Sequence, residues 1–336
     1  MKKLAFAILL VSFLSCGGNN EYSTELPPPP GMEQEEQKPS GNIDDTPTGE
    51  IRAKTPGSDW TKTEISEGLV MWSFKGKSPI TATNQIIDIV EVDMNFPRYT
   101  FHVKFHDPDS VSNIFKSTGA VVATNAGYGP VSVFIKDHGI VKSSIDLTMA
   151  TDRNEPEYAW CNDGGVYGRA DGRATIEHTR KGLTLQEFSQ YNLKRIEPNI
   201  VTSAPMLIDN FDPVGYKLDP DASTLHKDYI SLQNNVNPRT AVAVTDNNHM
   251  IFAVVNGRYT NAAGMTIAQL TKLLVEEFNP QYAINMDGGG SSTLCVKGLG
   301  DPVNNVVNYP NDNKRFDHYG QRKRRTTFYI MDSGKK

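Results

Sequence analysis

The nine residues 285–293 hold the combination of side chains in this sequence that is best suited to chemistry. One carboxylate, that of Asp287, follows the apolar run 282–284 and precedes three consecutive glycines and two serines. Glycine costs conformational entropy, so three in a row indicate that the backbone must approach something closely. The glycines and serines are Gly288, Gly289, Gly290, Ser291 and Ser292. We expect a site for a polar ligand, anionic or sugar-like. The alternative, a flexible turn between two strands, explains the glycines but not the acid with its two hydroxyl groups.

Five other segments accompany this one in a fixed order along the chain. They are Val122–Tyr128, Ser203–Leu207, Asn237–Ala241, Asn256–Arg258 and Gly264–Thr266. Together with the Asp-Gly-Gly-Gly-Ser element, they resemble the phosphodiester glycosidase family over about residues 115 to 333. Ala126 and Asn256 stand where the family usually has Gly and Asp, so the role of an acid at position 256 does not carry over. The resemblance implies a hydrolase that acts on a glycosyl phosphate without a cofactor.

A hairpin and a helix are predicted to place the acid. The segments 241–244 and 251–255 are apolar throughout, as in buried strands, and the turn residues 246–249 join them into a hairpin. A capping-box pattern then starts a helix at Thr266, and the next predicted strand is 282–286.

These elements should bring distant residues to one edge of a sheet. If the strands on either side of the helix share a sheet, the crossover makes them parallel, so Arg258 and Asp287 lie at the same edge. Arg239 starts the first hairpin strand and reaches that edge too. Asn125 follows the apolar run 121–123 and joins them if its strand runs parallel. Either arginine alone could make a surface salt bridge, but open α/β sheets bind ligands where such strand ends meet.

A sugar–phosphate diester fits these groups. Arginine presents a rigid fork of donors that matches phosphate oxygens, and glycines can expose backbone amides to the same anion. We expect the phosphate at Arg239, Arg258 and the amides of residues 288–290, and the sugar hydroxyls at Asn125, Ser291 and Ser292.

One carboxylate can suffice for this chemistry. Ordinary glycosidases need two, because an alkoxide leaves poorly and must be protonated. A phosphate monoester, with a second pKa of about 6, leaves without full protonation. Asp287 is therefore predicted to act as nucleophile or general base, with both roles open. Asp163 and Asp209 are weaker candidates for a second acid.

The N-terminus resembles a bacterial lipoprotein signal. Lys2 and Lys3 precede an apolar segment, 5–14, which is shorter than the roughly 20 residues that span a bilayer. Residues 13–16 approximate a lipobox, which predicts lipidation at Cys16 and anchoring of an exported protein to the outer or plasma membrane. The alternative is an ordinary signal peptide that is cleaved nearby.

The rest of the chain divides by composition. Residues 1–16 form the predicted signal, and 17–58 are rich in proline and glutamate with hardly an aliphatic residue, as in a disordered tether. A β-rich extension is expected at 59–110 and one large catalytic domain at 111–334. The predicted fold class is α+β, with a strand-rich mixed sheet and few helices.

Several kinds of partner are not expected. The formal net charge is −5, most of it in the tether, so the folded part is near neutral and nothing indicates a nucleic-acid binder. His102, Lys104 and His106 alternate with apolar residues, which indicates the wet face of a strand rather than metal ligands. No metal-binding motif occurs, and Cys161 and Cys295 have no disulfide-like spacing.

Two other functions use the same residues. The chain could be a non-catalytic surface lipoprotein that binds glycans or sugar phosphates. It could also be an enzyme that cleaves the P–O bond of a glycosyl phosphate rather than the C–O bond.

Overall fold

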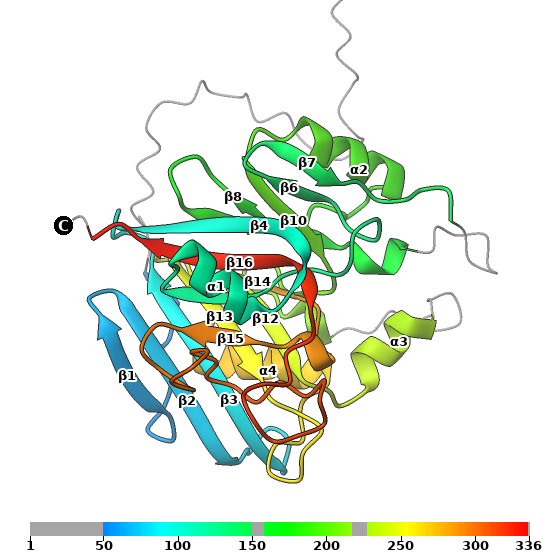
Figure 1. Ribbon diagram of the computed structural model, residues 1–336. Coiled ribbons are helices and arrows are strands. Elements are labelled where there is room, and N and C mark those ends of the chain that lie inside the picture. Colours follow the sequence, from blue (N-terminus) through cyan, green and yellow to red (C-terminus); the bar gives the residue numbers. More distant parts are fainter. Residues whose placement is uncertain (1–49, 150–157, 217–226, 335–336) are drawn as a thin grey trace, which may run out of the picture. The chain divides into compact units, whose positions relative to one another are not determined.

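The computed structural model describes residues 50–149, 158–216 and 227–334 (Figure 1). All of them belong to one compact unit, Thr46–Lys336. The predicted signal with Cys16, and residues 17–49 of the predicted tether, lie outside the described residues. The last tether residues, 50–58, are described and bonded to the domain: Arg52 N donates to Asp246 Oδ2 at 2.6 Å and Lys54 N to Phe278 O at 2.7 Å. The folded part therefore begins before residue 59, because backbone hydrogen bonds hold a segment that has no apolar pattern of its own.

The largest sheet has seven strands. In spatial order they are β1 (Thr61–Ser66), β2 (Leu69–Lys77), β3 (Asn84–Asp93), β13 (His249–Val255), β12 (Arg239–Val244), β14 (Tyr282–Asn285) and β11 (Met206–Ile208). Three of these strands come from the predicted N-terminal extension, which is thus strand-rich and paired with the later part of the chain. All pairs are antiparallel, so the sheet is not mixed in its hydrogen bonding.

The predicted hairpin and helix are both present. β12 pairs with β13, with Arg239 opposite Val255, and α4 (Ile267–Glu277) begins at a complete capping box formed by Thr266 and Gln269. β12 lies between β13 and β14 and is antiparallel to both, so these two strands run parallel to each other without being neighbours. Their carboxyl ends lie at one edge of the sheet, as expected.

A four-stranded sheet supplies the second layer around the site. Its order is β15 (Leu294–Val296), β5 (Val122–Asn125), β16 (Arg324–Asp332) and β4 (Tyr99–Asp109). In β4, Phe101 and Val103 are buried while His102 is half-buried and Lys104 is exposed, which confirms the predicted alternation.

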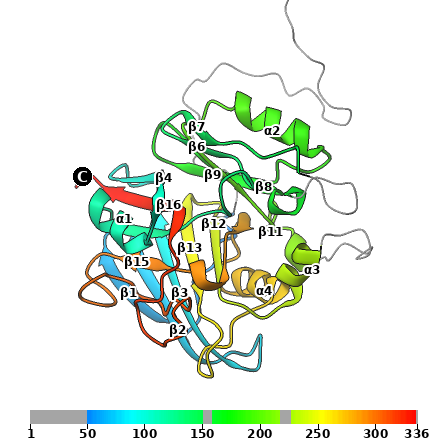
Figure 2. The same cartoon turned by 45° about the vertical axis from the view of Figure 1, so that its right-hand side comes forward.

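A five-stranded sheet completes the fold (Figure 2). Its order is β7 (Ile140–Ser143), β6 (Ile135–Asp137), β10 (Asn199–Ser203), β8 (Gly164–Gly168) and β9 (Ala174–Glu177). The helix α2 (Leu185–Lys194) packs on it through Leu185 and Phe188.

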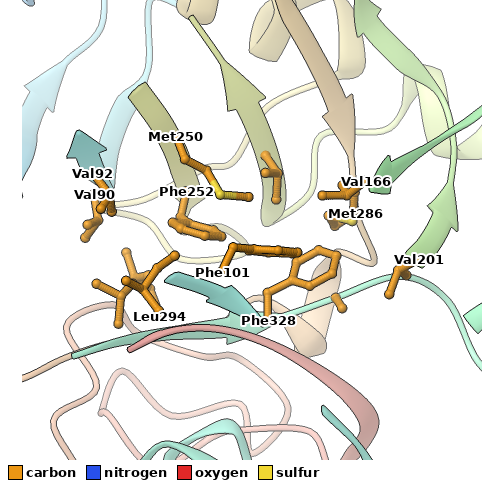
Figure 3. Packing of buried hydrophobic residues seen from close by; sticks show 14 of the residues in the cluster. Val90, Val92, Phe101, Val166, Val201, Met250, Phe252, Met286, Leu294 and Phe328 are labelled. Carbon is orange, nitrogen blue, oxygen red and sulfur yellow. The ribbon is translucent and has the colours of Figure 1, made fainter. Parts of the chain in front are cut away.

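The central core lies where the sheets face one another (Figure 3). Phe101 of β4 and Phe328 of β16 pack with ring centroids 5.2 Å apart, close to Phe252 of β13. Val166 and Val201 come to the same cluster from the five-stranded sheet. A second core fills the other face of the seven-stranded sheet, where α4 lies. Burial of this apolar surface, at roughly 25 cal/mol per Å², is the main force that fixes the sheets around the site.

The remaining elements are short. They are α1 (Val111–Thr118), α3 (Lys227–Asn234) and the 3₁₀ turns η1 (Ala159–Cys161), η2 (Val214–Tyr216) and η3 (Gly289–Ser291). The strand-rich α+β class is confirmed. In the part of the chain that the structure describes, no helix is both long and apolar enough to cross a membrane.

Candidate active site

Asp287 lies in the turn that follows β14, between two sheets. Its side chain is 14% exposed, and its Oδ2 is 2.8 Å from Nη2 of Arg324, the first residue of β16. The distance is that of an ion pair, but the angles are not those of a hydrogen bond, so Oδ2 still lacks a directed donor. A carboxylate oxygen in this state can accept a further bond from a ligand.

The surroundings of Asp287 favour its neutral form. Burial raises the pKa of Asp287, and the Arg324 guanidinium, followed by the nearby Ser291 hydroxyl and Arg322, acts in the opposite direction. Desolvation outweighs the positive charges, so the carboxyl is a stronger base than an exposed aspartate. Such a shift is common for carboxyl groups that take part in proton transfer or nucleophilic attack.

Each of the three glycines leaves room for a different neighbour. A Cβ on Gly288 would lie 2.8 Å from the Pro238 carbonyl oxygen. Gly289 has a φ of 62°, and its Cβ would lie 3.2 Å from Nη2 of Arg258. A Cβ on Gly290 would lie 2.5 Å from Asp312 Oδ1 and 2.8 Å from Nη2 of Arg322. The glycines therefore let two guanidinium groups and one carboxylate pack directly on the turn.

The turn itself uses most of its backbone amides. The amide of Gly289 donates to Pro238 O at 2.9 Å, and those of Ser291 and Ser292 donate to Gly288 O and Gly289 O, both at 3.2 Å. The expectation of three bare glycine amides is thus not met at Gly289, because the η3 turn and the neighbouring strand use the donors.

Arg258 lies beside the turn, as predicted. It is exposed, its Nη2 donates to Asn237 Oδ1 at 2.9 Å and its Nη1 to Asn311 Oδ1 at 3.1 Å. Among the residues that the structure describes, its hydrogen-bond partners are neutral and none pairs with its positive charge. An exposed guanidinium of this kind is suited to binding an anion.

Arg239 lies at the same sheet edge, but its guanidinium binds backbone carbonyls of the protein, whereas a phosphate was predicted. The residue is 1% exposed, and its guanidinium donates to three backbone carbonyls. These are Met265 O at 2.7 Å, Leu232 O at 2.7 Å and Asn235 O at 2.6 Å. Burial lowers the pKa of Arg239 to about 10. The side chain holds α3 and the loop before α4 together.

Asn125 comes to the site from the four-stranded sheet rather than from a parallel strand beside β14. Its Nδ2 donates to Asp287 O at 2.6 Å, and its Oδ1 accepts from Thr293 N at 3.0 Å and from Thr240 Oγ1 at 3.1 Å. The amide therefore clamps both ends of the glycine-rich turn, which leaves it little capacity for a sugar hydroxyl.

Buried polar atoms without a hydrogen-bond partner gather at this turn. In the described part of the chain there are seven such side-chain atoms, and five belong to residues 285–293. The five are Asn285 Oδ1, Asp287 Oδ2, Ser291 Oγ, Ser292 Oγ and Thr293 Oγ1. Folded proteins satisfy the great majority of their buried polar groups, so this concentration sets the turn apart from the rest of the described chain.

Asp163 and Asp209, the weaker candidates for a second acid, face a histidine. His178 Nε2 is 3.0 Å from Asp163 Oδ1, and its Nδ1 is 3.0 Å from Asp209 Oδ2. Burial alone would lower the pKa of His178, but the two carboxylates raise it above its ordinary value. A pocket of about 240 Å³ lies over Asp163, His178 and Tyr229. Both acids are thus held by ion pairs.

Sequence reasoning missed four residues of the site. The basic run 322–325 is not part of the predicted site, yet Arg324 contacts Asp287 and Arg322 packs on Gly290. Asp312 pairs with Arg322 at 2.7 Å, and Asn311 bonds Arg258. A basic run at the start of a strand near the carboxyl end was the available signal, but its contacts depend on how two sheets pack.

The other segments of the sequence pattern also meet here. Asp287 N donates to Ala126 O, Asn285 N to Pro205 O and Met286 N to Thr240 O. Asn237 and Met265 exchange backbone hydrogen bonds. Asn256 is buried and bonds Ile86 O and Asp88 through Nδ2, so its amide serves the sheet.

Among the residues that the structure describes, no group of three or more His, Cys, Asp or Glu side chains could hold a metal ion. Cys161 and Cys295 are both buried and are not joined to each other by a disulfide.

Several solved structures share this fold, among them one from Synechocystis and one from zebrafish. A hypothetical protein from Synechocystis aligns with a TM-score of 0.58 and 11% identity over 82% of this chain, which covers 64% of that protein's length. The zebrafish N-acetylglucosamine-1-phosphodiester alpha-N-acetylglucosaminidase catalytic domain, auto-inhibited by its pro-peptide, aligns with a TM-score of 0.52 and 17% identity. That alignment covers 84% of this chain and 87% of the zebrafish domain. At these identities the likeness shows the fold alone.

No curated protein matches the chain. Residues 116–331, however, match the phosphodiester glycosidase family, and they include the glycine-rich turn, both flanking strands and Arg258, Arg322 and Arg324. Because this match spans more than half of the sequence, the protein belongs to the phosphodiester glycosidase family.

Proposed function

We propose that this protein hydrolyses the glycosidic bond of a sugar-1-phosphate diester, with Asp287 as the reacting carboxylate. The observation that carries the proposal is the buried Asp287 in a three-glycine turn on which guanidinium groups pack directly. The family to which the chain belongs acts on this class of bond, which supports the same reaction here.

In the proposed reaction, the C–O bond between the anomeric carbon and the phosphate oxygen breaks. Water supplies the new oxygen on the sugar, and a phosphate monoester leaves with the old one. Asp287 either attacks the anomeric carbon, forming a glycosyl ester that water then hydrolyses, or removes a proton from the attacking water. Its raised pKa suits both roles, since a more basic carboxylate is the better nucleophile and the better base.

The phosphate is assigned to Arg258 and Arg322. Arg258 is exposed and Arg322, which pairs with Asp312, has a side chain that is 42% exposed; they pack on Gly289 and Gly290 respectively. They would stabilise the charge that builds up on the departing phosphate, which reduces the need for a second carboxylic acid. Arg239, whose Nε and Nη2 donate to carbonyls, is assigned a positioning role, and so is Asn125.

The sugar is assigned to the unsatisfied polar atoms of the turn. The hydroxyls of Ser291, Ser292 and Thr293 and the Oδ1 of Asn285 can each exchange a hydrogen bond with a sugar hydroxyl. This part of the proposal also fits a non-catalytic receptor for sugar phosphates, so turnover is the decisive measurement.

The test is hydrolysis of α-glycosyl phosphate diesters with a chromogenic leaving group, beginning with N-acetylglucosamine because the zebrafish neighbour is named for it. In heavy-oxygen water, C–O cleavage places the label in the released sugar, whereas P–O cleavage places it in the phosphate product. Label in the sugar supports the proposal. Label in the phosphate would establish the P–O alternative, and binding without turnover of any diester would establish the receptor.

The proposed location is the bacterial cell envelope, with a lipid anchor on Cys16. The sequence pattern at residues 13–16 supports it. A Cys16→Ser variant should be released from the membrane fraction, and retention of that variant through an acyl group would contradict the proposal.

A further inference from the structure

A partly exposed aromatic stack lies next to Arg258, one of the two arginines that we assign to the phosphate. The rings of Tyr309 and Phe316 are parallel, 3.9 Å apart with an interplanar angle of 9°. Tyr259 meets Phe316 edge to face at 5.1 Å, and His318 stacks on Tyr309 at 4.5 Å. Three of these rings come from the segment between β15 and β16, and the fourth from the turn after β13, which the ribbon views show beside it (Figures 1 and 2).

Hydrogen bonds around the stack hold its rings in place, and Phe316 stays partly exposed. The Tyr259 hydroxyl donates to Arg315 O at 2.5 Å, and Tyr309 N donates to Asn256 Oδ1 at 2.6 Å. His318 Nδ1 lies 2.7 Å from Asn308 O. Phe316 nevertheless remains 42% exposed. A half-exposed phenyl ring that is already held in place forms a preformed apolar surface, because a ligand that binds it does not have to restrict the side chain further.

Both chain segments that form the stack also contribute residues that lie at the glycine-rich turn. Tyr259 directly follows Arg258, so their Cα atoms are about 3.8 Å apart. Asn311, two residues after Tyr309, accepts the hydrogen bond from Arg258 Nη1. Asp312, the next residue, packs over Gly290. The aromatic surface therefore continues outward from the position assigned to the phosphate.

We propose that Phe316, held in place by Tyr309 and Tyr259, forms a subsite for a sugar ring carried on the far side of the phosphate, that is, on the leaving group. The inference rests on the proposed function, in which this side of the diester must extend away from the turn. The C–H bonds on one face of a pyranose carry partial positive charge and meet the negative face of an aromatic ring favourably. The residues that flank Phe316 in the sequence are polar, among them the exposed Asn313 and the half-buried Asp317, which are hydrogen-bonded to each other at 2.9 Å. An acyl chain would have no use for such a polar rim.

The experiment compares three diesters of one glycosyl phosphate, whose leaving groups carry a methyl, an octyl or a glucosyl group. Phe316→Ala removes the ring, and Phe316→Leu keeps apolar volume without an aromatic face. Tyr216→Ala is the matched control, because Tyr216 is also 42% exposed and lies in η2. Thermal unfolding of each variant checks that it is folded.

Both Phe316 variants should lower kcat/KM for the glucosyl diester by about 3- to 10-fold, mainly through KM, and should leave the methyl diester unchanged. The control should change neither. An equal loss on the methyl diester, no loss on the glucosyl diester, or a loss on the octyl diester that Leu restores would each overturn the subsite. If wild-type protein turned over no diester, the proposed function would fail separately. Calorimetric binding of the glucosyl diester would then decide: weaker binding to the Phe316 variants supports the subsite and unchanged binding overturns it.

Discussion

The guanidinium of Arg324 lies 2.8 Å from the carboxylate of Asp287, and this ion pair joins the four-stranded sheet to the seven-stranded sheet at the candidate site. Arg324 is the first residue of β16, and Asp287 is the second residue after β14. The pair does more than connect sheets, because the positive charge opposes the effect of burial on the pKa of Asp287. It therefore sets the pH range in which the acid is ionised.

Replacing Arg324 by Gln should move the acidic limb of the pH profile upward. Without the guanidinium, burial raises the pKa of Asp287 further, so a higher pH is needed to form the carboxylate. The measurement is kcat/KM against pH. Arg325→Gln is the control, since Arg325 pairs at 3.5 Å with the fully exposed Asp107. An unmoved limb in the Arg324 variant would show that Asp287 is not the group that titrates.

Replacing Asp287 by Asn should abolish hydrolysis and leave the fold intact. The side chain keeps its shape but loses its charge and nucleophilicity, so kcat/KM should fall by about 10⁴-fold or more. Circular dichroism and the unfolding temperature report on the fold. The exposed Asp107→Asn should behave as wild type. Near-normal turnover by a folded Asp287→Asn protein would remove Asp287 from the mechanism.

Arg258 and Arg239 should differ in what they lose when replaced by Ala. Loss of a charge-assisted bond of about 1.5–3 kcal/mol predicts a roughly 10- to 150-fold fall in kcat/KM for Arg258→Ala, with a much smaller effect on a neutral glycoside. Arg239→Ala removes the side-chain donor of Leu232 O and Asn235 O and one of the two donors of Met265 O, so it should chiefly lower the free energy of unfolding, by about 1–3 kcal/mol for each carbonyl that water does not reach. Urea unfolding and kinetics on both substrates separate the two effects. A stable, inactive Arg239→Ala protein would instead support direct phosphate binding by Arg239.

Two glycines of the turn should give opposite results when replaced by Ala. At Gly290 the new methyl group meets the ends of two side chains, Asp312 and Arg322, which can move aside. Activity should fall while stability is nearly unchanged, because the phosphate-binding guanidinium is displaced. At Gly288 the methyl group meets the Pro238 carbonyl, which is backbone, so stability should fall. Gly57→Ala is the control, since nothing lies within 4 Å of its Cβ. The outcome to look for against this prediction is a fully active Gly290→Ala protein.

Asp88 should make the protein more stable at acidic than at alkaline pH. Burial raises the pKa of Asp88 to about 7, despite hydrogen bonds from Asn256 and Ser73. Between pH 4 and 7 the folded state therefore binds a proton at Asp88 that the unfolded state does not, so the contribution of Asp88 to stability is greatest below about pH 4 and is lost as the pH rises through 7. The shift of about three units corresponds to at most about 4 kcal/mol. Asp88→Asn should remove this dependence and raise stability at pH 8. Urea unfolding at pH 5 and pH 8 measures both values, and parallel curves for the two proteins would contradict the assignment.

Much of the site could be predicted because the signals are local. The capping box at Thr266, the turn between β12 and β13 and the glycine run after Asp287 each depend on residues a few positions apart, and the structure confirms all three elements. The crossover through α4 then fixed the direction of β14 relative to β13 and hence the common edge of Arg239, Arg258 and Asp287.

Tertiary structure alone decided which side chains the acid meets. Arg324 reaches Asp287 because two sheets pack around a shared core, and no spacing in the sequence encodes that contact. Arg239 lies at the predicted edge, but its guanidinium donates to carbonyls in and just after α3 and in the segment before α4, since these segments pack around its buried side chain. Sequence periodicity places a residue on a strand and a face; the direction and partners of a long, flexible side chain depend on the segments that burial brings together.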